Sequence, residues 1–196
     1  MISSILLAAG MSTRMGKLKQ LLDWGGEPLI AYQVKQLVEA GCDEVIVVLG
    51  FHGDEIHRSI NKLPCRVMLN PRFHAGRAGS LRIGAKAMNR DADAVVIANV
   101  DQPRPASLVA SLVAAHDPKY AATRYSYEGH SGHPLVVSGW LRPELLEASD
   151  ASDGLRGIIR AHASEVQELP GDAMCTLDVN TPEEYAAAAK QFGFAS

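Results

Sequence analysis

Residues 2–10 read ISSILLAAG, an apolar run that ends in a glycine turn. Such a run predicts a strand buried on both faces, which is typical of a parallel sheet covered by helices. Residues 29–40 have helical spacing, and Gly41 follows them in the position of a C-cap glycine. Residues 44–49 repeat the buried-strand pattern. The chain therefore begins with a strand, a helix and a second strand that we expect to be parallel to the first.

The same alternation continues along the chain. Further strands are expected at residues 66–69, 94–100, 120–125, 135–137, 166–169 and 176–179. Further helices are expected at residues 54–60, 81–88, 105–116, 141–147, 154–162 and 182–192. This order predicts an α/β protein with a Rossmann-like three-layer α/β/α architecture and a mostly parallel central sheet. No linker-like composition interrupts residues 1–196, so we expect a single domain.

Composition and charge exclude several classes of protein. Lysine and arginine number 19 against 22 acidic residues, so the basic excess of a nucleic-acid-binding protein is absent. No apolar run reaches the roughly 20 residues of a membrane span, and residues 1–10 lack the basic start of a signal peptide. The three cysteines are odd in number and far apart, which favours a reducing compartment. We therefore expect a cytoplasmic protein that binds neither nucleic acid nor a membrane.

The loop after the first strand is the strongest functional signal. Residues 7–19 read LAAGMSTRMGKLK, with two glycines, two hydroxyls, three cations and no carboxylate. Small residues let the backbone approach an anion and cations neutralise it, so this composition predicts a polyphosphate cradle. It is not a dinucleotide fingerprint, because G-x-G-x-x-G is absent. It is not a P-loop either, because five residues separate Gly10 from Gly16 and Leu18 follows Lys17.

This loop, written L-A-A-G-x-S-x-R-M-G-x-x-K-x-L-L, resembles the signature loop of the MobA-like nucleotidyltransferases. The A-A-G version is most similar to the MocA branch, the molybdenum cofactor cytidylyltransferases. Four more segments resemble family motifs: N-P…S-L-x-x-G at residues 70–84, D-Q-P at 101–103, G-H-P at 132–134 and D-V-N-T-P-E-E at 178–184. The resemblance covers nearly the whole chain and implies a fold of the nucleotide-diphospho-sugar transferase type.

The resemblance also implies an activity: transfer of CMP from CTP to the terminal phosphate of molybdopterin, with Mg²⁺ as cofactor and release of pyrophosphate. CTP and molybdopterin would be the substrates, and a molybdoenzyme or its chaperone would be a partner. The implied catalytic residues are Arg14, Lys19 and Asp101. The implied nucleotide-binding residues are Leu7, Ala8, Ala9, Gly10, Ser12, Arg14, Lys19 and Ser80. The implied metal ligands are Asp101, Asp178 and Asn180, and the implied acceptor-binding residues are Gly132, His133, Pro134, Asp153 and Arg156.

The carboxylates fit this chemistry. Asp101 ends a buried strand, where parallel sheets bind ligands, and Asp178 or Asn180 is expected to approach it from the last strand. The alternative is that Asp101 caps the helix that begins near Pro105. A phosphate monoester is largely dianionic near neutrality because its second pKa is about 6, so the acceptor needs no strong general base. Cations and a metal that hold two anions together are sufficient.

Two departures from the family pattern leave alternatives open. Asn180 stands where the family often has aspartate, and residues 152–156 match G-D-x-G-x-R only in part. The acceptor could therefore be another phosphorylated molecule, such as a sugar phosphate. Relatives of this branch resemble a pigment reductase, so an NADPH-dependent reductase is a further hypothesis, as is a non-catalytic cofactor carrier. Ala9, larger than glycine, would narrow the base pocket and favour a pyrimidine over guanine.

Overall fold

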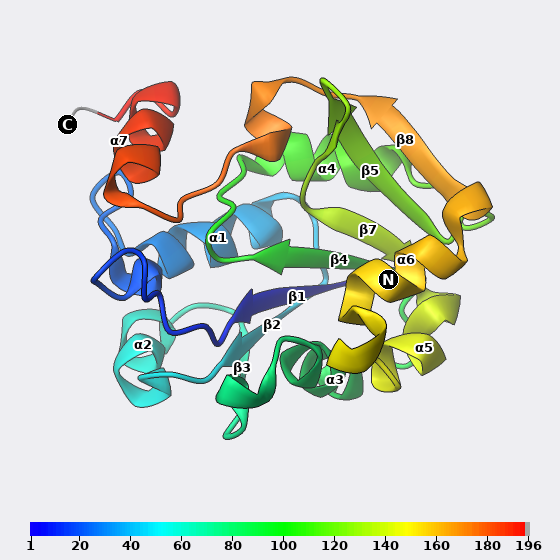
Figure 1. Ribbon diagram of the computed structural model, residues 1–196, viewed down its shortest axis with the longest axis horizontal. Coiled ribbons are helices and arrows are strands. Elements are labelled where there is room, and N and C mark those ends of the chain that lie inside the picture. The colour runs from blue at the N-terminus through cyan, green and yellow to red at the C-terminus, as the bar shows by residue number, and fades with distance from the viewer. Residues whose placement is uncertain (195–196) are drawn as a thin grey trace.

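The computed structural model describes residues 1–194. Its centre is an eight-stranded sheet in the order β3-β2-β1-β4-β7-β5-β6, with β8 paired to β5 (Figure 1). The strands are β1 (Ile2–Ala8), β2 (Glu44–Leu49), β3 (Arg66–Leu69), β4 (Ala94–Asn99), β5 (Ala122–Tyr127), β6 (His130–Ser131), β7 (Leu135–Ser138) and β8 (Val166–Pro170).

Helices cover both faces of this sheet. They are α1 (Leu29–Glu39), α2 (Gly53–Ile60), α3 (Ala78–Ala87), α4 (Ala106–Ala115), α5 (Arg142–Leu146), α6 (Gly154–Ala161) and α7 (Pro182–Gln191). Two short 3₁₀ helices, η1 (Lys19–Leu21) and η6 (Ala173–Thr176), lie in the connections that matter below. Within the described residues, no helix combines the length and apolar character needed to cross a membrane.

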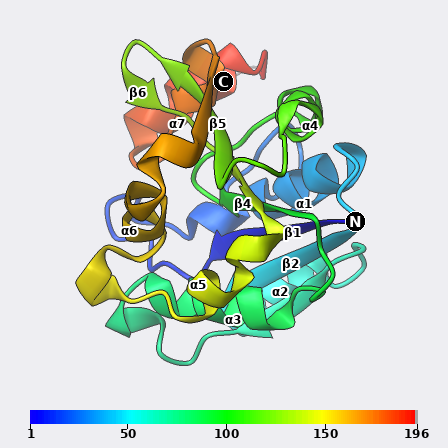
Figure 2. The same ribbon diagram turned by 90° about the vertical axis from the view of Figure 1, so that its right-hand side faces the viewer.

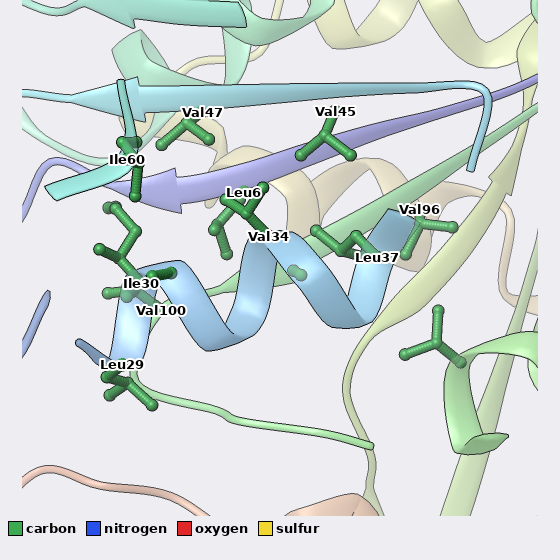
Figure 3. Close-up of a cluster of buried hydrophobic side chains, with 14 of the residues drawn as sticks. Leu6, Leu29, Ile30, Val34, Leu37, Val45, Val47, Ile60, Val96 and Val100 are labelled. Carbon is green, nitrogen blue, oxygen red and sulfur yellow. The ribbon is translucent and has the colours of Figure 1, made fainter. Parts of the chain in front are cut away.

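Side chains of the central strands alternate between two hydrophobic clusters. Leu6 of β1 belongs to the cluster that includes residues of α1, α2, α4 and α7, whereas its neighbour Ile5 belongs to the cluster that includes residues of α3, α5 and α6. Figure 3 shows the first cluster, in which Val34 and Leu37 of α1 lie against the sheet. Figure 2, turned by 90°, shows α3 and α5 on the side of the strands away from α4. The predicted three-layer α/β/α architecture is confirmed.

Strand direction determines where the loops gather. β3, β2, β1 and β4 are mutually parallel, so their carboxyl ends lie at one edge of the sheet. β7 is antiparallel to both β4 and β5, and β5 is parallel to β8. Because β7 runs against β4, the segment before β7, rather than the one after it, lies at that same edge. The sheet is therefore mixed but mostly parallel, as predicted.

Two expectations about individual elements are corrected. The helix expected at residues 81–88 begins earlier, at Ala78, because the Asp150 carboxylate accepts hydrogen bonds from the Arg77 and Ala78 amides at 2.9 and 3.1 Å. The strand expected at residues 176–179 is absent, and η6 occupies the start of this stretch. Val179 is nevertheless fully buried in the first hydrophobic cluster. Its apolar character therefore reflects burial in a loop and not membership of the sheet.

Candidate active site

The loop after β1 is folded back on itself by two polar side chains. The buried Gln20 amide donates to the carbonyl oxygens of Ala8 and Gly10 at 2.8 and 3.2 Å. Ser12, whose φ of 55° lies in the left-handed region, accepts a hydrogen bond from the Lys19 amide through its hydroxyl at 3.1 Å. This folding closes the loop and brings the start of η1 back to the sheet edge.

Lys19 is thereby turned inward. Its side chain is only 10% exposed, and its ammonium lies 2.7 Å from Asn180 Oδ1 and 3.3 Å from Asp101 Oδ2. A buried ammonium is stable only where oxygen atoms replace its hydration, and these two groups provide them. The structure thus brings together three predicted site residues that are separated by 82 and 161 positions along the chain.

The segment with Asp178 and Asn180 lies alongside the turn after β4. The Val179 amide donates to the Asp101 carbonyl at 2.8 Å, and Figure 1 shows this orange segment passing beside the green one that follows β4. Gln102 Nε2 donates to Asp178 Oδ1 at 2.8 Å, and Asn180 Nδ2 lies 3.4 Å from Asp178 Oδ2. Asp178 and Asn180 therefore reach the Asp101 turn, although from an extended loop and not from a strand.

The helix-capping alternative for Asp101 finds no support in the hydrogen bonds. Pro105 occupies the N-cap position of α4, and the amide of the first helical residue, Ala106, donates to Gln36 Oε1 at 2.8 Å and not to Asp101. The Asp101 carboxylate is instead paired with Lys19.

The donor chemistry of this cluster suits a divalent cation. Two carboxylates and one amide oxygen are hard oxygen ligands, which Mg²⁺ prefers. The ammonium held between Asp101 and Asn180 shows that their oxygens already face a cation. Among residues 1–194, no group of three or more histidine, cysteine, aspartate or glutamate side chains could hold a metal. A bound Mg²⁺ would therefore complete its shell with phosphate and water oxygens, as is usual for this ion.

Three other predicted nucleotide-binding residues, Ser80, Ala9 and Leu7, lie near the carboxyl ends of β3 and β1. The buried Ser80 hydroxyl of α3 accepts a hydrogen bond from Asn70 Nδ2 at 2.9 Å, directly after β3. The carbonyl of Ala9 accepts one from the Phe51 amide at 3.3 Å, so the glycine loop is attached to the turn after β2. An open groove lined in part by Gly50, Asn70 and Phe73 adjoins this region. Leu7, through its carbonyl, accepts a hydrogen bond from the Val100 amide and ties β1 to β4.

The predicted acceptor-binding residues fall into two groups. The first group, Gly132, His133 and Pro134, precedes β7 and lies at the edge of the sheet formed by the carboxyl ends of β1 to β4. There the His133 amide donates to the Cys175 carbonyl at 2.9 Å. Burial and the nearby Arg104 guanidinium lower the pKa of His133, so its imidazole is neutral at pH 7. Asp153 and Arg156 are exposed, and the Asp153 carboxylate pairs with Arg160 of its own helix at 2.8 Å. The structure therefore does not bring Asp153 into contact with Lys19, Asp101 or Asn180.

Sequence reasoning missed three residues that shape the site. Asp150, and not Asp153, reaches across to the start of α3, and the sequence D-A-S-D contains no local signal that separates the two. Gln20 and Arg104 act through bonds to distant carbonyls, which leave no periodic pattern in the sequence.

Arg14→Ala is expected to lower turnover of a nucleoside triphosphate more than ten-fold with the fold intact. Arg14 is exposed on the loop and pairs with no carboxylate within the described residues, so it is available for a charge-assisted phosphate contact of about 1.5–3 kcal/mol. Steady-state kinetics of pyrophosphate release would measure the loss. Arg90→Ala is the matched control, because Arg90 is an exposed arginine that lies before β4, at the opposite end of that strand from the loop. Equal turnover by Arg14→Ala and the parent would argue against phosphate binding by this side chain.

The model of the MobA-like NTP transferase domain matches residues 4–166, which include most of β1, all of β2 to β7 and the first residue of β8. The chain belongs to the MobA-like NTP transferase family. This membership confirms the family predicted from the loop after β1 and makes the chain a nucleotidyltransferase domain.

Similar proteins of this family extend over almost the full chain. Nicotine blue oxidoreductase of Paenarthrobacter nicotinovorans is 29% identical over 192 residues, covering 93% of this chain and 94% of that protein. Molybdenum cofactor cytidylyltransferase of Escherichia coli strain K12 is 22% identical over 193 residues, covering 97% of each chain. Crystalline Rv0371c of Mycobacterium tuberculosis H37Rv has a TM-score of 0.84 at 25% identity, covering 96% and 97% of the two chains. A complex of Rv0371c with manganese superposes with a TM-score of 0.78 at 24% identity, covering 96% and 98%.

Proposed function

We propose that this chain is a molybdenum cofactor cytidylyltransferase that transfers CMP from CTP to the terminal phosphate of molybdopterin and releases pyrophosphate. The observation that carries the proposal is the convergence of Lys19, Asp101 and Asn180 beside the basic glycine loop. The full-length similarity to the E. coli cytidylyltransferase supports it. The product would pass to a molybdoenzyme or its chaperone in the cytoplasm.

The residues divide the work in the proposed reaction. Leu7, Ala8, Ala9, Gly10 and Ser12 cradle the nucleotide with Ser80, while Arg14 and Lys19 neutralise the triphosphate. The acceptor phosphate attacks the α-phosphorus, the bond from that phosphorus to the bridging oxygen breaks, and pyrophosphate leaves with the electron pair. Because the acceptor phosphate is already largely dianionic, the protein needs only to hold and orient two anions.

A divalent cation completes this proposal. Asp101 with Asp178 or Asn180 would hold Mg²⁺, whose charge would stabilise the triphosphate when bound. The manganese complex of Rv0371c supports a divalent cation in this fold. Gly132, His133 and Pro134 would line the acceptor side, with Asp153 and Arg156 farther along it.

CTP is expected to be used better than GTP by about ten-fold or more, the scale at which one methyl group discriminates between substrates. Ala9 is 8% exposed and its carbonyl is bonded to the turn after β2, so the loop around its methyl group cannot easily widen to admit the larger guanine base. The measurement is kcat/KM for pyrophosphate release with each of the four nucleoside triphosphates. Ala9→Gly should narrow the difference between CTP and GTP. Equal or better use of GTP by the parent would contradict the cytidylyltransferase assignment.

One assay separates the proposed function from its competitors. Purified protein, Mg²⁺ and CTP are incubated with molybdopterin, with a sugar phosphate, or with no acceptor, and pyrophosphate is measured. Release of pyrophosphate only with molybdopterin supports the proposal. Release only with the sugar phosphate would show that the acceptor is a sugar phosphate and not molybdopterin. The absence of release with any acceptor, together with retained CTP binding, would instead indicate a non-catalytic carrier.

The second candidate function is an NADPH-dependent reductase. Its support is the 29% identity to nicotine blue oxidoreductase, which is higher than the 22% identity to the cytidylyltransferase. Oxidation of NADPH in the presence of a quinonoid dye, followed at 340 nm without CTP, tests this candidate directly. Turnover of NADPH in the absence of pyrophosphate release would favour it over nucleotidyl transfer.

A further inference from the structure

Arg104 is the one buried arginine among residues 1–194, with 2% of its surface exposed. Its guanidinium contacts no carboxylate within that range and donates only to backbone carbonyls. Nε donates to His133 at 2.8 Å, Nη2 to Cys175 at 2.8 Å, and Nη1 to Pro103 and Leu177 at 2.7 and 2.8 Å. Burial lowers the pKa of Arg104 to about 10, so the group remains charged at neutral pH.

The four carbonyls belong to three segments that carry candidate site residues. Pro103 lies in the turn with Asp101, His133 lies in the segment before β7, and Cys175 and Leu177 directly precede Asp178. None of these acceptors is part of a strand. The planar guanidinium group therefore links three loops to one another. It does not link the sheet to the helices that cover it.

The three segments are otherwise joined by few bonds. The His133 amide donates to the Cys175 carbonyl, the Val179 amide donates to the Asp101 carbonyl, and Gln102 Nε2 donates to Asp178 Oδ1. The segments also lie very close together, since a Cβ placed on Gly132 would lie 2.9 Å from the Cys175 carbonyl oxygen. A small displacement of one segment would thus change the distances between the candidate site residues that the three segments carry.

We propose that Arg104 is a positioning residue, which fixes Asp101, the Asp178–Asn180 pair and the segment before β7 at their working separations. This inference deepens the proposed function, because it rests on the roles given there to those side chains. Arg104 itself touches no substrate in this account. Lysine cannot replace it, because a single ammonium cannot donate in one plane to three separate segments.

The test compares Arg104→Met and Arg104→Lys with Leu145→Ala. Leu145 is fully buried in the second hydrophobic cluster, on α5, so its truncation destabilises the fold without touching the three segments. Binding of Mn²⁺ in the presence of CTP is measured by electron paramagnetic resonance, and hydrogen exchange is measured at residues 173–181 and in β1. Kinetics give kcat and KM for CTP.

In both Arg104 variants the Mn²⁺ dissociation constant should rise by about ten-fold or more, the usual effect of losing a group that orients ligands. Exchange at residues 173–181 should accelerate while β1 stays protected, and kcat should fall with little change in KM for CTP. Leu145→Ala should lower the melting temperature and leave Mn²⁺ affinity and local exchange unchanged. Arg104 variants that behave like Leu145→Ala would overturn the proposal.

The two proposals fail in different ways. A parent protein that releases no pyrophosphate would contradict the proposed function, but hydrogen exchange would still decide whether Arg104 holds the three segments. Arg104→Lys, which keeps the charge and most of the aliphatic stem, provides the decisive variant if Arg104→Met does not fold.

Discussion

Asp101→Asn is expected to lower Mg²⁺-dependent nucleotidyl transfer by about 100-fold or more, a loss typical of removing one group that stabilises transition-state charge. The substitution preserves shape and removes one negative charge, so it tests electrostatics and not packing. The side chain of Asp101 is 29% exposed and makes no helix cap, and asparagine keeps a side-chain oxygen for the Lys19 ammonium, so the melting temperature should change little. Pyrophosphate release over a Mg²⁺ titration, with thermal unfolding in parallel, measures both effects.

Asp91→Asn is the matched control for this experiment. Asp91 is exposed and lies before β4, at the opposite end of that strand from Asp101. It should leave activity and Mg²⁺ dependence unchanged. Retained activity in Asp101→Asn would remove the basis for the metal assignment and for most of the proposed mechanism.

Lys19→Ala is expected to reduce turnover of CTP by more than ten-fold, and more severely than Arg14→Ala. Lys19 is buried and contacts both Asp101 and Asn180, so its removal leaves the Asp101 carboxylate without its ion-pair partner. In the proposed function Lys19 also binds the triphosphate, and the lost phosphate contact would be worth about 1.5–3 kcal/mol. Lys35→Ala, an exposed lysine paired with Glu27, is the control.

A double-mutant cycle sharpens this second prediction. Because Lys19 and Asp101 are in direct contact, the losses in Lys19→Ala and Asp101→Asn should not add in the double variant. Additive losses in kcat/KM would show that the two side chains act independently, contrary to the geometry of the cluster.

Much of the site could be predicted because the carboxyl ends of parallel strands converge. That rule alone predicts that Asp101, which follows β4, lies at the edge where ligands bind, and Gly10 and Asn70 follow β1 and β3 at the same edge. The apolar strands themselves left little ambiguity, since β1 and β2 are buried on both faces. The family motif at residues 178–184 predicts the two remaining site residues, Asp178 and Asn180.

The remainder could not be predicted because it depends on long-range bonds to backbone carbonyls. Arg104 stands among prolines in a turn, where a charged residue is expected to be exposed, yet it is buried by carbonyls from residues 29 to 73 positions away. The expected strand at residues 176–179 was wrong for a related reason: burial of Val179 produces the same apolar signal as a strand. Neither outcome has a local signature in the sequence.

The contact between Lys19 and Asn180 spans almost the whole chain, and this has a consequence for biosynthesis. A ribosome delivers all eight strands by Pro170, before Asp178 and Asn180 emerge. Domains commonly begin to fold as they are synthesised, so the sheet can form while the Lys19 ammonium still lacks one of its two oxygen partners. Chains stalled shortly after β8 would thus hold the Lys19 ammonium without its Asn180 partner, and we expect these contacts to form only once residues 178–180 have emerged.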